Sequence, residues 1–308
     1  GTAQMLYQAS NSLANGFSMM FNNISEVYED SLFMTDFTWF MDLQPLNQQG
    51  KISPQKTFKQ GIVFDNVWFK YPSSRKWILK SVSLEIGPKD NVALVGENGA
   101  GKTTLLKLLC GLYQPTKGKI TVNGISVDQY KYDKYHKILS VLFQDFSTYP
   151  FSARESIGYG DIDKIDDLTN IELVAKQTDV HDFINKLPNK YETPLTKELE
   201  GGLDPSKGQW QRIGLSRALL RDSKIVILDE PTSNVDSKAE EDIFKKLLKI
   251  VKDKILILVS HRFSTVRRAD KILVLDKGNI TEQGSHELLM KRSGKYAHLF
   301  NLQAKSYQ

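Results

Sequence analysis

Cysteine is nearly absent from this 308-residue chain, which contains only Cys110, placed in an apolar helical run. A single cysteine cannot form an internal disulfide, which fits a reducing cytosolic face. The simplest role for Cys110 is that of a small buried apolar side chain. A basic segment is also missing from residues 1–25, so the sequence predicts no signal peptide.

Blocks of like charge are missing as well. The chain carries 41 Lys and Arg against 36 Asp and Glu, and the formal charge of +5 is spread over its length. This distribution argues against a dedicated nucleic-acid surface, so we expect no nucleic-acid partner, and any phosphate site should be local. The composition, 40% hydrophobic and 25% charged, is that of a globular protein, and the length allows a large core and two structural units.

Residues 1–25 contain no charged side chain, although ten of them are Gln, Asn or Ser. An apolar residue recurs every seven positions and predicts a helix that continues past this segment: Leu6, Leu13, Met20, Val27, Met34 and Met41. At 1.5 Å per residue, 25 residues reach roughly 37 Å, which exceeds the ~30 Å core of a bilayer. A membrane span that lines a polar cavity could have this composition, but the segment alone favours a long amphipathic helix of a soluble protein.

Residues 44–60 are polar, contain Pro45, Gly50 and Pro54, and are typical of a linker. From Gly61 onward, apolar strand-like runs alternate with helical patterns to the end of the chain. This alternation predicts an α/β domain built on a mostly parallel sheet.

The clearest motif is "NVALVGENGAGKTTLLKLL", in which a short apolar strand is followed by a glycine-rich turn and a helix. Gly96, Gly101, Lys102 and Thr103 satisfy the pattern G-x-x-x-x-G-K-[ST] of a phosphate-binding loop. The glycines let backbone N–H groups wrap around phosphate oxygens, and the helix that opens at Gly101 points the positive end of its dipole at them. We expect Lys102 to reach the β and γ phosphates and the Thr103 hydroxyl to bind Mg²⁺.

Two further apolar runs end in residues suited to phosphate chemistry. Residues 225–228 lead into Asp229 and Glu230, and residues 255–259 are followed closely by His261. Because ligands of open α/β sheets bind at the carboxyl ends of the strands, these side chains should face the same crevice as the phosphate loop. Asp229 would order Mg²⁺, Glu230 would polarise a water as general base, and His261 would bridge the γ phosphate and that water. The three segments together predict binding and hydrolysis of a nucleoside triphosphate.

The segment "LDPSKGQWQR" contains a helix start whose role the three motifs above do not explain. Ser206 and Gln209 make an S-x-x-Q capping box, and Lys207 and Gly208 lie just inside it. A helix N-terminus of this kind suits an anion, and the sequence motifs alone do not say which molecule carries that anion.

With these motifs in place, residues 61–308 closely resemble the ATP-binding cassette domain of ABC transporters. "GENGAGKT" resembles its Walker A motif, "IVILDE" its Walker B motif, "PSKGQ" its signature LSGGQ, and "SNVD" its D-loop. His261 stands where the family has its switch histidine, Gln144 where it has the Q-loop glutamine, and Tyr71 where an aromatic ring stacks on adenine. The resemblance implies the α/β fold of a P-loop NTPase. Its parts would be a mostly parallel core sheet, an antiparallel β subdomain and a helical subdomain at about residues 146–222, preceded by the long N-terminal helix.

The resemblance also implies a set of site residues. Lys102, Glu230 and His261 would be catalytic, and Thr103, Gln144 and Asp229 would hold Mg²⁺. The ATP-binding residues would be Tyr71, Gly96, Glu97, Asn98, Gly99, Ala100, Gly101, Lys102, Thr103, Thr104, Gln144, Ser206, Gly208, Gln209 and Asp236.

A second cassette is the partner that the resemblance implies. In this family two cassettes pair head to tail, so Ser206 and Gly208 of one chain would face the γ phosphate bound by the other. ATP would then hold a dimer together and hydrolysis would release it; we expect a homodimer, with a heterodimer left open. The signature departs from the family at Pro205, which is compatible with a helix start, and at Lys207, whose positive charge would tune affinity or turnover.

The segments "EGGLDPSKGQWQRIGLSRALLRD" and "GNITEQGSHELLMKRSGKYAHLF" resemble exporter cassettes, in which membrane and ATPase parts share one chain. Exporter cassettes directly follow the last transmembrane helix of their half. Residues 1–43 would therefore be the end of that helix and its cytosolic extension, followed by the linker at 44–60. We expect a membrane-associated chain whose cassette lies on the cytoplasmic face, as in a bacterial inner membrane, and works with a transmembrane domain to export a substrate that the sequence does not identify.

Two other functions stay open at this point. One is a soluble ABC-type ATPase that acts on nucleic acid or chromosome structure, and the other is a separate ATPase subunit of an importer. The single cassette and the diffuse charge disfavour the first, and the helix over residues 1–43 disfavours the second.

Overall fold

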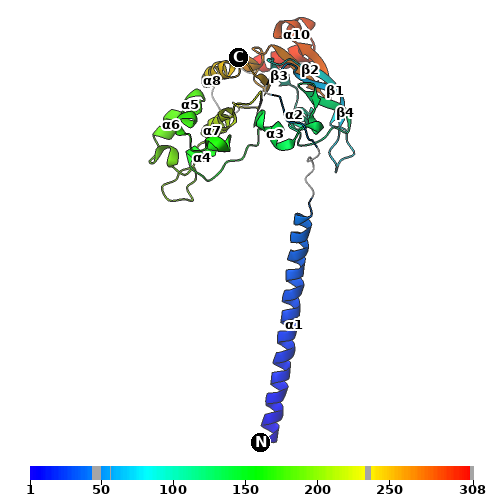
Figure 1. Cartoon of the computed structure of the whole chain (residues 1–308), viewed down its shortest axis with the longest axis vertical. Coiled ribbons are helices and arrows are strands. Elements are labelled where there is room, and N and C mark those ends of the chain that lie inside the picture. The colour runs from blue at the N-terminus through cyan, green and yellow to red at the C-terminus, as the bar shows by residue number, and fades with distance from the viewer. Residues whose placement is uncertain (44–49, 56, 233–236, 306–308) are drawn as a thin grey trace. The chain divides into compact units, whose positions relative to one another are not determined.

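The computed structural model describes residues 1–43, 50–55, 57–232 and 237–305, and the chain divides into two units, Gly1–Leu46 and Asn47–Gln308. The first unit is one helix, α1 (Thr2–Met41), drawn in blue in Figure 1, and none of its residues is buried. This confirms the long N-terminal helix that the seven-residue apolar spacing predicts. Within the described ranges, no helix combines the length and the apolar character that crossing a membrane requires.

Two sheets form the framework of the second unit. The core sheet has the strand order β10-β9-β3-β8-β7-β6, and its neighbours pair in parallel except for the antiparallel pair of β9 and β10. The second sheet has the order β2-β1-β4-β5 and is antiparallel throughout. The predicted α/β fold, with a mostly parallel core sheet and an antiparallel β subdomain, is therefore confirmed.

The strands of the core sheet are β3 (Asn91–Val95), β6 (Leu139–Leu142), β7 (Ile225–Asp229), β8 (Ile255–Val259), β9 (Lys271–Asp276) and β10 (Asn279–Gly284). Those of the antiparallel sheet are β1 (Ile62–Phe69), β2 (Leu79–Ile86), β4 (Lys117–Val122) and β5 (Ile125–Ser126). The longer helices of the second unit are α2 (Lys102–Leu109), α5 (Leu168–Gln177), α7 (Lys207–Leu220), α8 (Ser237–Ile250) and α11 (Lys295–Lys305). The shorter ones are α3 (Tyr132–Lys137), α4 (Ala153–Gly158), α6 (His181–Asn185), α9 (Phe263–Val266) and α10 (His286–Arg292), with 3₁₀ turns η1 (Val127–Gln129), η2 (Ile162–Lys164) and η3 (Lys190–Glu192).

Helices cover both faces of the core sheet, which explains why β7 and β8 are apolar at nearly every position. All five residues of each of these strands are buried, as expected for parallel strands covered on two sides. One face packs with α2 against the antiparallel sheet, and the other packs against α7 and α8. Polar residues suited to a ligand follow these strands at their carboxyl ends, where open α/β sheets bind their ligands.

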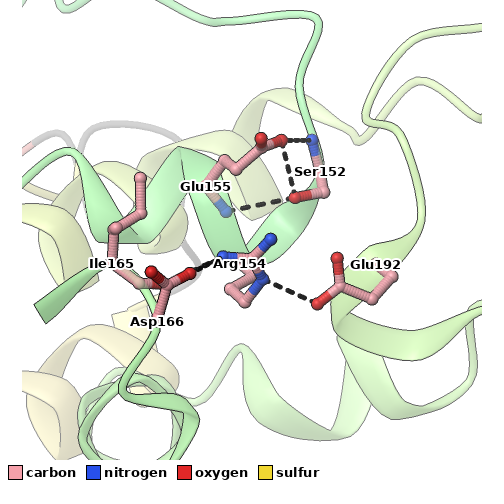
Figure 2. A network of polar contacts seen from close by, with 6 residues as sticks. All are labelled: Ser152, Arg154, Glu155, Ile165, Asp166 and Glu192. Atoms are coloured by element: carbon pink, nitrogen blue, oxygen red, sulfur yellow. Dashed lines mark hydrogen bonds and ion pairs between the residues drawn. The ribbon is translucent and has the colours of Figure 1, made fainter.

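A mostly helical region lies between β6 and β7, and α4, α5, α6 and α7 lie together there, away from β1 and β4 (Figure 1). Ser152 and Glu155 form a capping box at the start of α4, and hydrogen bonds from the Ser152 N–H and hydroxyl lower the pKa of Glu155. Figure 2 shows Arg154 of the same helix between the carboxylates of Asp166, 3.0 Å away, and Glu192, 2.7 Å away. Arg154 thereby ties α4 to the segment before α5 and to η3.

The end of the sequence-predicted linker is hydrogen-bonded to the second unit. The Ile52 N–H donates to the Gln129 carbonyl at 3.0 Å, and the Lys131 N–H donates to the Ile52 carbonyl at 2.8 Å. The Lys59 and Gln60 N–H groups both donate to the Asn123 side chain at 2.9 Å. Residues 52, 59 and 60 are therefore held through their backbone against residues 123, 129 and 131 of the second unit.

Candidate functional site

The phosphate loop runs from the end of β3 to the start of α2, and two of its glycines are required by geometry. Gly101, the N-cap of α2, has φ 108°, and a Cβ there would lie 2.8 Å from Leu79 Cδ2. A Cβ at Gly96 would lie 2.2 Å from the Leu275 carbonyl oxygen. At Gly96 a side chain would clash with the backbone, and at Gly101 the positive φ is one that other residues rarely adopt, so glycine is favoured where backbone N–H groups come close to a bound anion.

Lys102 begins α2 and turns its side chain back over the loop. Its Nζ donates to the carbonyl oxygens of Gly96 at 2.8 Å and Glu97 at 3.0 Å, and the residue is 8% exposed. Burial lowers the pKa of Lys102, and the negative charges of Asp229 and Glu230 act in the opposite direction. The ammonium group is thus desolvated and held at the loop, where it can exchange carbonyl oxygens for phosphate oxygens at little conformational cost.

Asp229 ends β7 next to the start of α2. Thr103 Oγ1 donates to its Oδ2 at 3.1 Å, and the aspartate is 2% exposed. Burial raises the pKa of Asp229, while the hydrogen bond from Thr103 opposes that shift. A buried carboxylate beside a hydroxyl suits a hard cation that keeps most of its ligands from phosphates and water. Among the described residues, no three or more His, Cys, Asp and Glu side chains are grouped so that they could hold a metal ion.

Glu230 and His261 follow the carboxyl ends of the adjacent strands β7 and β8, and both side chains line the same cleft. His261 Nε2 lies 3.0 Å from Glu230 Oε1, and because a carboxylate only accepts hydrogen bonds, Nε2 carries the proton. Desolvation and the charge of Lys102 lower the pKa of His261, although Glu230 acts in the opposite direction, and the net effect favours the neutral ring. Glu230 itself has φ 52°, an uncommon value for a residue other than glycine, and Gln211 Nε2 donates to its carbonyl at 2.7 Å.

A cleft of about 440 Å³ collects most of the predicted residues, and this volume lies within the range of small-molecule sites. Its lining consists of Tyr71, Ile78, Asn98, Gly99, Gly101, Lys102, Thr103, Thr104, Gln144, Asp229, Glu230 and His261. Tyr71 lines the cleft at the loop before β2, where its hydroxyl lies 3.1 Å from Thr104 Oγ1. Its ring also packs edge to face on Phe69 and Tyr113, so this aromatic ring is both a packing residue and a wall of the cleft.

The other predicted residues lie outside this lining. Gly96 and Glu97 line a neighbouring hollow that also includes Asn98 and His261, and Ala100 is buried within the loop. Asp236 lies outside the described residues.

Ser206, Gly208 and Gln209 are at the start of α7, also outside the cleft. The predicted capping box is confirmed there, because the Gln209 N–H donates to Ser206 Oγ at 3.3 Å and the Ser206 N–H donates to Gln209 Oε1 at 2.7 Å.

Three contacts at the site were not predicted from the sequence. Ile78 adds an apolar wall to the cleft, and Gln211 holds the carbonyl of Glu230. Lys295, the first residue of α11, bridges Asp276 at 2.7 Å and Glu97 of the phosphate loop at 3.1 Å. Gln211 lies just after the signature segment, but no pattern assigns a role to any of these three residues, and their places depend on packing between distant segments.

Comparisons with known proteins agree with this geometry. Residues 79–233 match the family model described as ABC transporter. The chain is 36% identical to the subtilin transport ATP-binding protein SpaT of Bacillus subtilis over 293 residues. The matched region covers 95% of this chain and 48% of that protein. The chain is also 36% identical over 263 residues to the ATP-dependent lipid A-core flippase of Alkalilimnicola ehrlichii, covering 85% of this chain and 44% of the flippase.

A solved structure is similar as well. The structure of a bacterial Atm1-family ABC exporter with ATP bound matches with a TM-score of 0.81 and 30% sequence identity, over 90% of this chain and 48% of that one. The chain thus spans about half the length of the proteins that it matches.

Proposed function

Because the chain belongs to the ABC transporter family, we propose that it is the ATP-binding and ATP-hydrolysing cassette of an exporter. One observation carries the proposal: the phosphate loop, Asp229, Glu230 and His261 share a single cleft although they lie at the carboxyl ends of three separate strands. A binding protein without hydrolysis would need the loop and a cation site only. The paired Glu230 and His261 are what a reaction with water requires in addition.

The chemistry follows from the charges around the cleft. Lys102 and the backbone N–H groups of the loop bind the β and γ phosphates, with the adenine placed along Tyr71. Thr103, Asp229 and Gln144 would hold Mg²⁺, which neutralises charge on the β and γ phosphates when bound. Glu230 accepts a proton from a water as that water forms a bond to the γ phosphorus, and the bond from this phosphorus to the β–γ bridging oxygen breaks. When ATP is bound, the neutral His261 ring would donate its Nε2 proton, which Glu230 accepts in this structure, to the γ phosphate and so stabilise the charge there.

The start of α7 supports a dimer in which the site is completed by a second chain. Ser206 and Gly208 present a capped helix N-terminus that lies outside the cleft of their own chain, and Lys207 adds an exposed positive charge. Paired head to tail, each chain would place this N-terminus on the γ phosphate that its partner binds. A homodimer would have two equivalent sites, and a heterodimer is the alternative.

For α1 we propose the end of a transmembrane helix with its cytoplasmic extension. The large apolar side chains of this 40-residue helix are all exposed, and the matched proteins are about twice as long as this chain. Polar residues in its uncharged first 25 positions fit a span that faces other spans or a polar cavity. The cassette would then lie on the cytoplasmic face of a bacterial membrane. The names of these two relatives refer to different molecules, subtilin and lipid A-core, so they do not select a substrate for this chain.

Sedimentation of a Glu230→Gln variant with and without Mg-ATP tests the proposal. This variant should bind ATP without hydrolysing it, so we expect a monomer alone and a dimer with Mg-ATP. Adding Ser206→Arg should abolish the dimer but not ATP binding by the single chain. Ser285→Arg is a matched control, because Ser285 also caps a helix through its Oγ, at 3.4 Å from the Leu288 nitrogen. Failure to bind ATP would contradict the proposed function, and dimerisation that persists in Ser206→Arg would contradict the head-to-tail site.

A further inference from the structure

Glu240 is a buried carboxylate that takes no part in the cleft. It lies in the first turn of α8, is 2% exposed, and receives hydrogen bonds from three side chains. Thr232 Oγ1 and Thr265 Oγ1 donate to its Oε1, both at 2.9 Å, and Arg262 Nη1 donates to its Oε2 at 2.5 Å. A carboxylate is almost never buried this deeply unless it is paired, and its removal would leave the paired groups unsatisfied.

The donors belong to the two segments that carry the reacting pair. Thr232 lies two residues after Glu230, where the chain leaves β7. Arg262 directly follows His261 after β8, and Thr265 lies in the short helix α9 that comes next. One carboxylate therefore links the continuation of the Glu230 strand to the continuation of the His261 strand.

This link is needed because the sheet stops short of both residues. The last paired residues of β7 and β8 are Asp229 and Val259, so no strand pairing fixes the chain beyond them. Glu230 keeps one backbone bond, from its N–H to the Val259 carbonyl at 2.9 Å, but its φ of 52° is intrinsically unfavourable. The 3.0 Å separation of His261 Nε2 and Glu230 Oε1 must therefore be maintained by contacts outside the sheet.

We propose that Glu240 is a positioning residue for hydrolysis: through Thr232, Arg262 and Thr265 it sets the position of His261 relative to Glu230. The proposal rests on the proposed function, because it concerns the reaction in the same cleft. Glu240 touches neither the cleft nor the reacting pair, so it acts only through the two segments that it joins. Its loss should affect the hydrolytic step and leave ATP binding by the phosphate loop unchanged.

The test is the steady-state ATPase rate of Glu240→Gln in the 308-residue chain. Glutamine keeps the shape and an oxygen acceptor for the two threonines but removes the ion pair with Arg262. We expect kcat to fall ~10- to 100-fold, the scale of a displacement of about 1 Å at a reacting group, with the KM for ATP within about twofold of wild type. Glu241→Gln is the matched control. Glu241 is the next residue of the same helix and pairs with Lys245 and Arg268, but it is 49% exposed, so its loss should change neither constant.

A double-mutant cycle separates positioning from a general loss of structure. In a His261→Ala background, Glu240→Gln should cost less than about twofold in kcat, because the side chain that it positions is already gone. Equal losses in both backgrounds, or a rise in KM with kcat unchanged, would overturn the proposal.

If Glu240→Gln does not fold, Thr265 offers a milder pair of variants. Thr265→Val removes one donor to Glu240 and should lower kcat, whereas Thr265→Ser keeps the hydroxyl and should retain wild-type kcat. Equal kcat in the two variants would also overturn the proposal. A wild-type chain that binds ATP but never hydrolyses it would contradict the proposed function instead, so the two failures are distinguishable.

Discussion

Cys110 should be unreactive toward thiol reagents until the core of the cassette opens by unfolding, and ATP should slow that opening. The thiol is 4% exposed in the core between the sheets, and burial raises its pKa from 9.0 to about 12. Three pKa units mean ~1000-fold less thiolate at neutral pH than in an exposed cysteine, and the thiolate is the species that reacts. Cys110 is the C-cap of α2, the helix that begins at the phosphate loop. An opening that exposes Cys110 should therefore also disrupt the ATP site.

The size of the ATP effect follows from linkage. A ligand that binds only the folded chain at 100 times its Kd stabilises it by about 2.7 kcal/mol, so labelling that requires opening should slow ~100-fold. The assay is alkylation by iodoacetamide, followed by intact mass at a series of Mg-ATP concentrations. In Lys102→Ala, which lacks the ammonium group at the loop, the protection should be lost.

The pH dependence has a defined sign. Below pH 9 the thiol is protonated in both states, so it does not affect stability. Above pH 9 the unfolded chain releases this proton first, so the free energy of unfolding should fall as the pH rises from 9 toward 12. Labelling of the native chain at a rate comparable to a free thiol, with no effect of ATP, would refute the reasoning.

Three further predictions concern single side chains. Leu106→Ala, which empties a fully buried position of α2, should lower the free energy of unfolding by about 2–5 kcal/mol in urea titrations, and a loss below 1 kcal/mol would contradict the assigned core. Tyr71→Ala should weaken ATP binding by 1–3 kcal/mol in calorimetry, about 5- to 150-fold, whereas Tyr71→Phe keeps the ring and loses only the hydroxyl contact with Thr104; equal losses would argue against stacking. Lys207→Glu should weaken the ATP-dependent dimer of the Glu230→Gln chain, most strongly at low salt, without altering ATP binding by the monomer; sedimentation that does not depend on salt would be inconsistent with a phosphate contact.

Local patterns predicted the parts of the site that depend on local geometry. The glycine spacing from Gly96 to Thr103 identifies the phosphate loop because the turn and the helix start are encoded within eight residues. Asp229 and His261 could be assigned to the same crevice because strands buried on both faces end at one edge of the sheet. The seven-residue spacing in residues 6–41 likewise predicted α1, whose last residue is Met41.

Contacts between distant segments could not be predicted in this way. Lys295 reaches Glu97 only because α11 packs beside the phosphate loop, and a lysine at a helix start carries no signal for that. Glu240 has the sequence context of an exposed helix position, next to Glu241, and only the fold shows that one is buried and the other exposed. For the same reason, the backbone pairing of Ile52 with Gln129 was hidden in a segment whose composition indicates a linker.

The position of β3 inside the core sheet has a consequence for synthesis of the chain. β3 is the first strand of that sheet to be made, yet its neighbours β8 and β9 are made only after β6 and β7, and Asn91 hydrogen-bonds to Asp270, 179 residues later. At ~5–20 residues per second, the ribosome needs roughly 9–36 s to deliver that partner. During this interval the phosphate loop has been made, but β3 does not yet have both of its neighbouring strands. We therefore expect that nucleotide does not assist the early steps of folding. A message that stops before β9 would yield a chain that contains the entire nucleotide motif and cannot form its site.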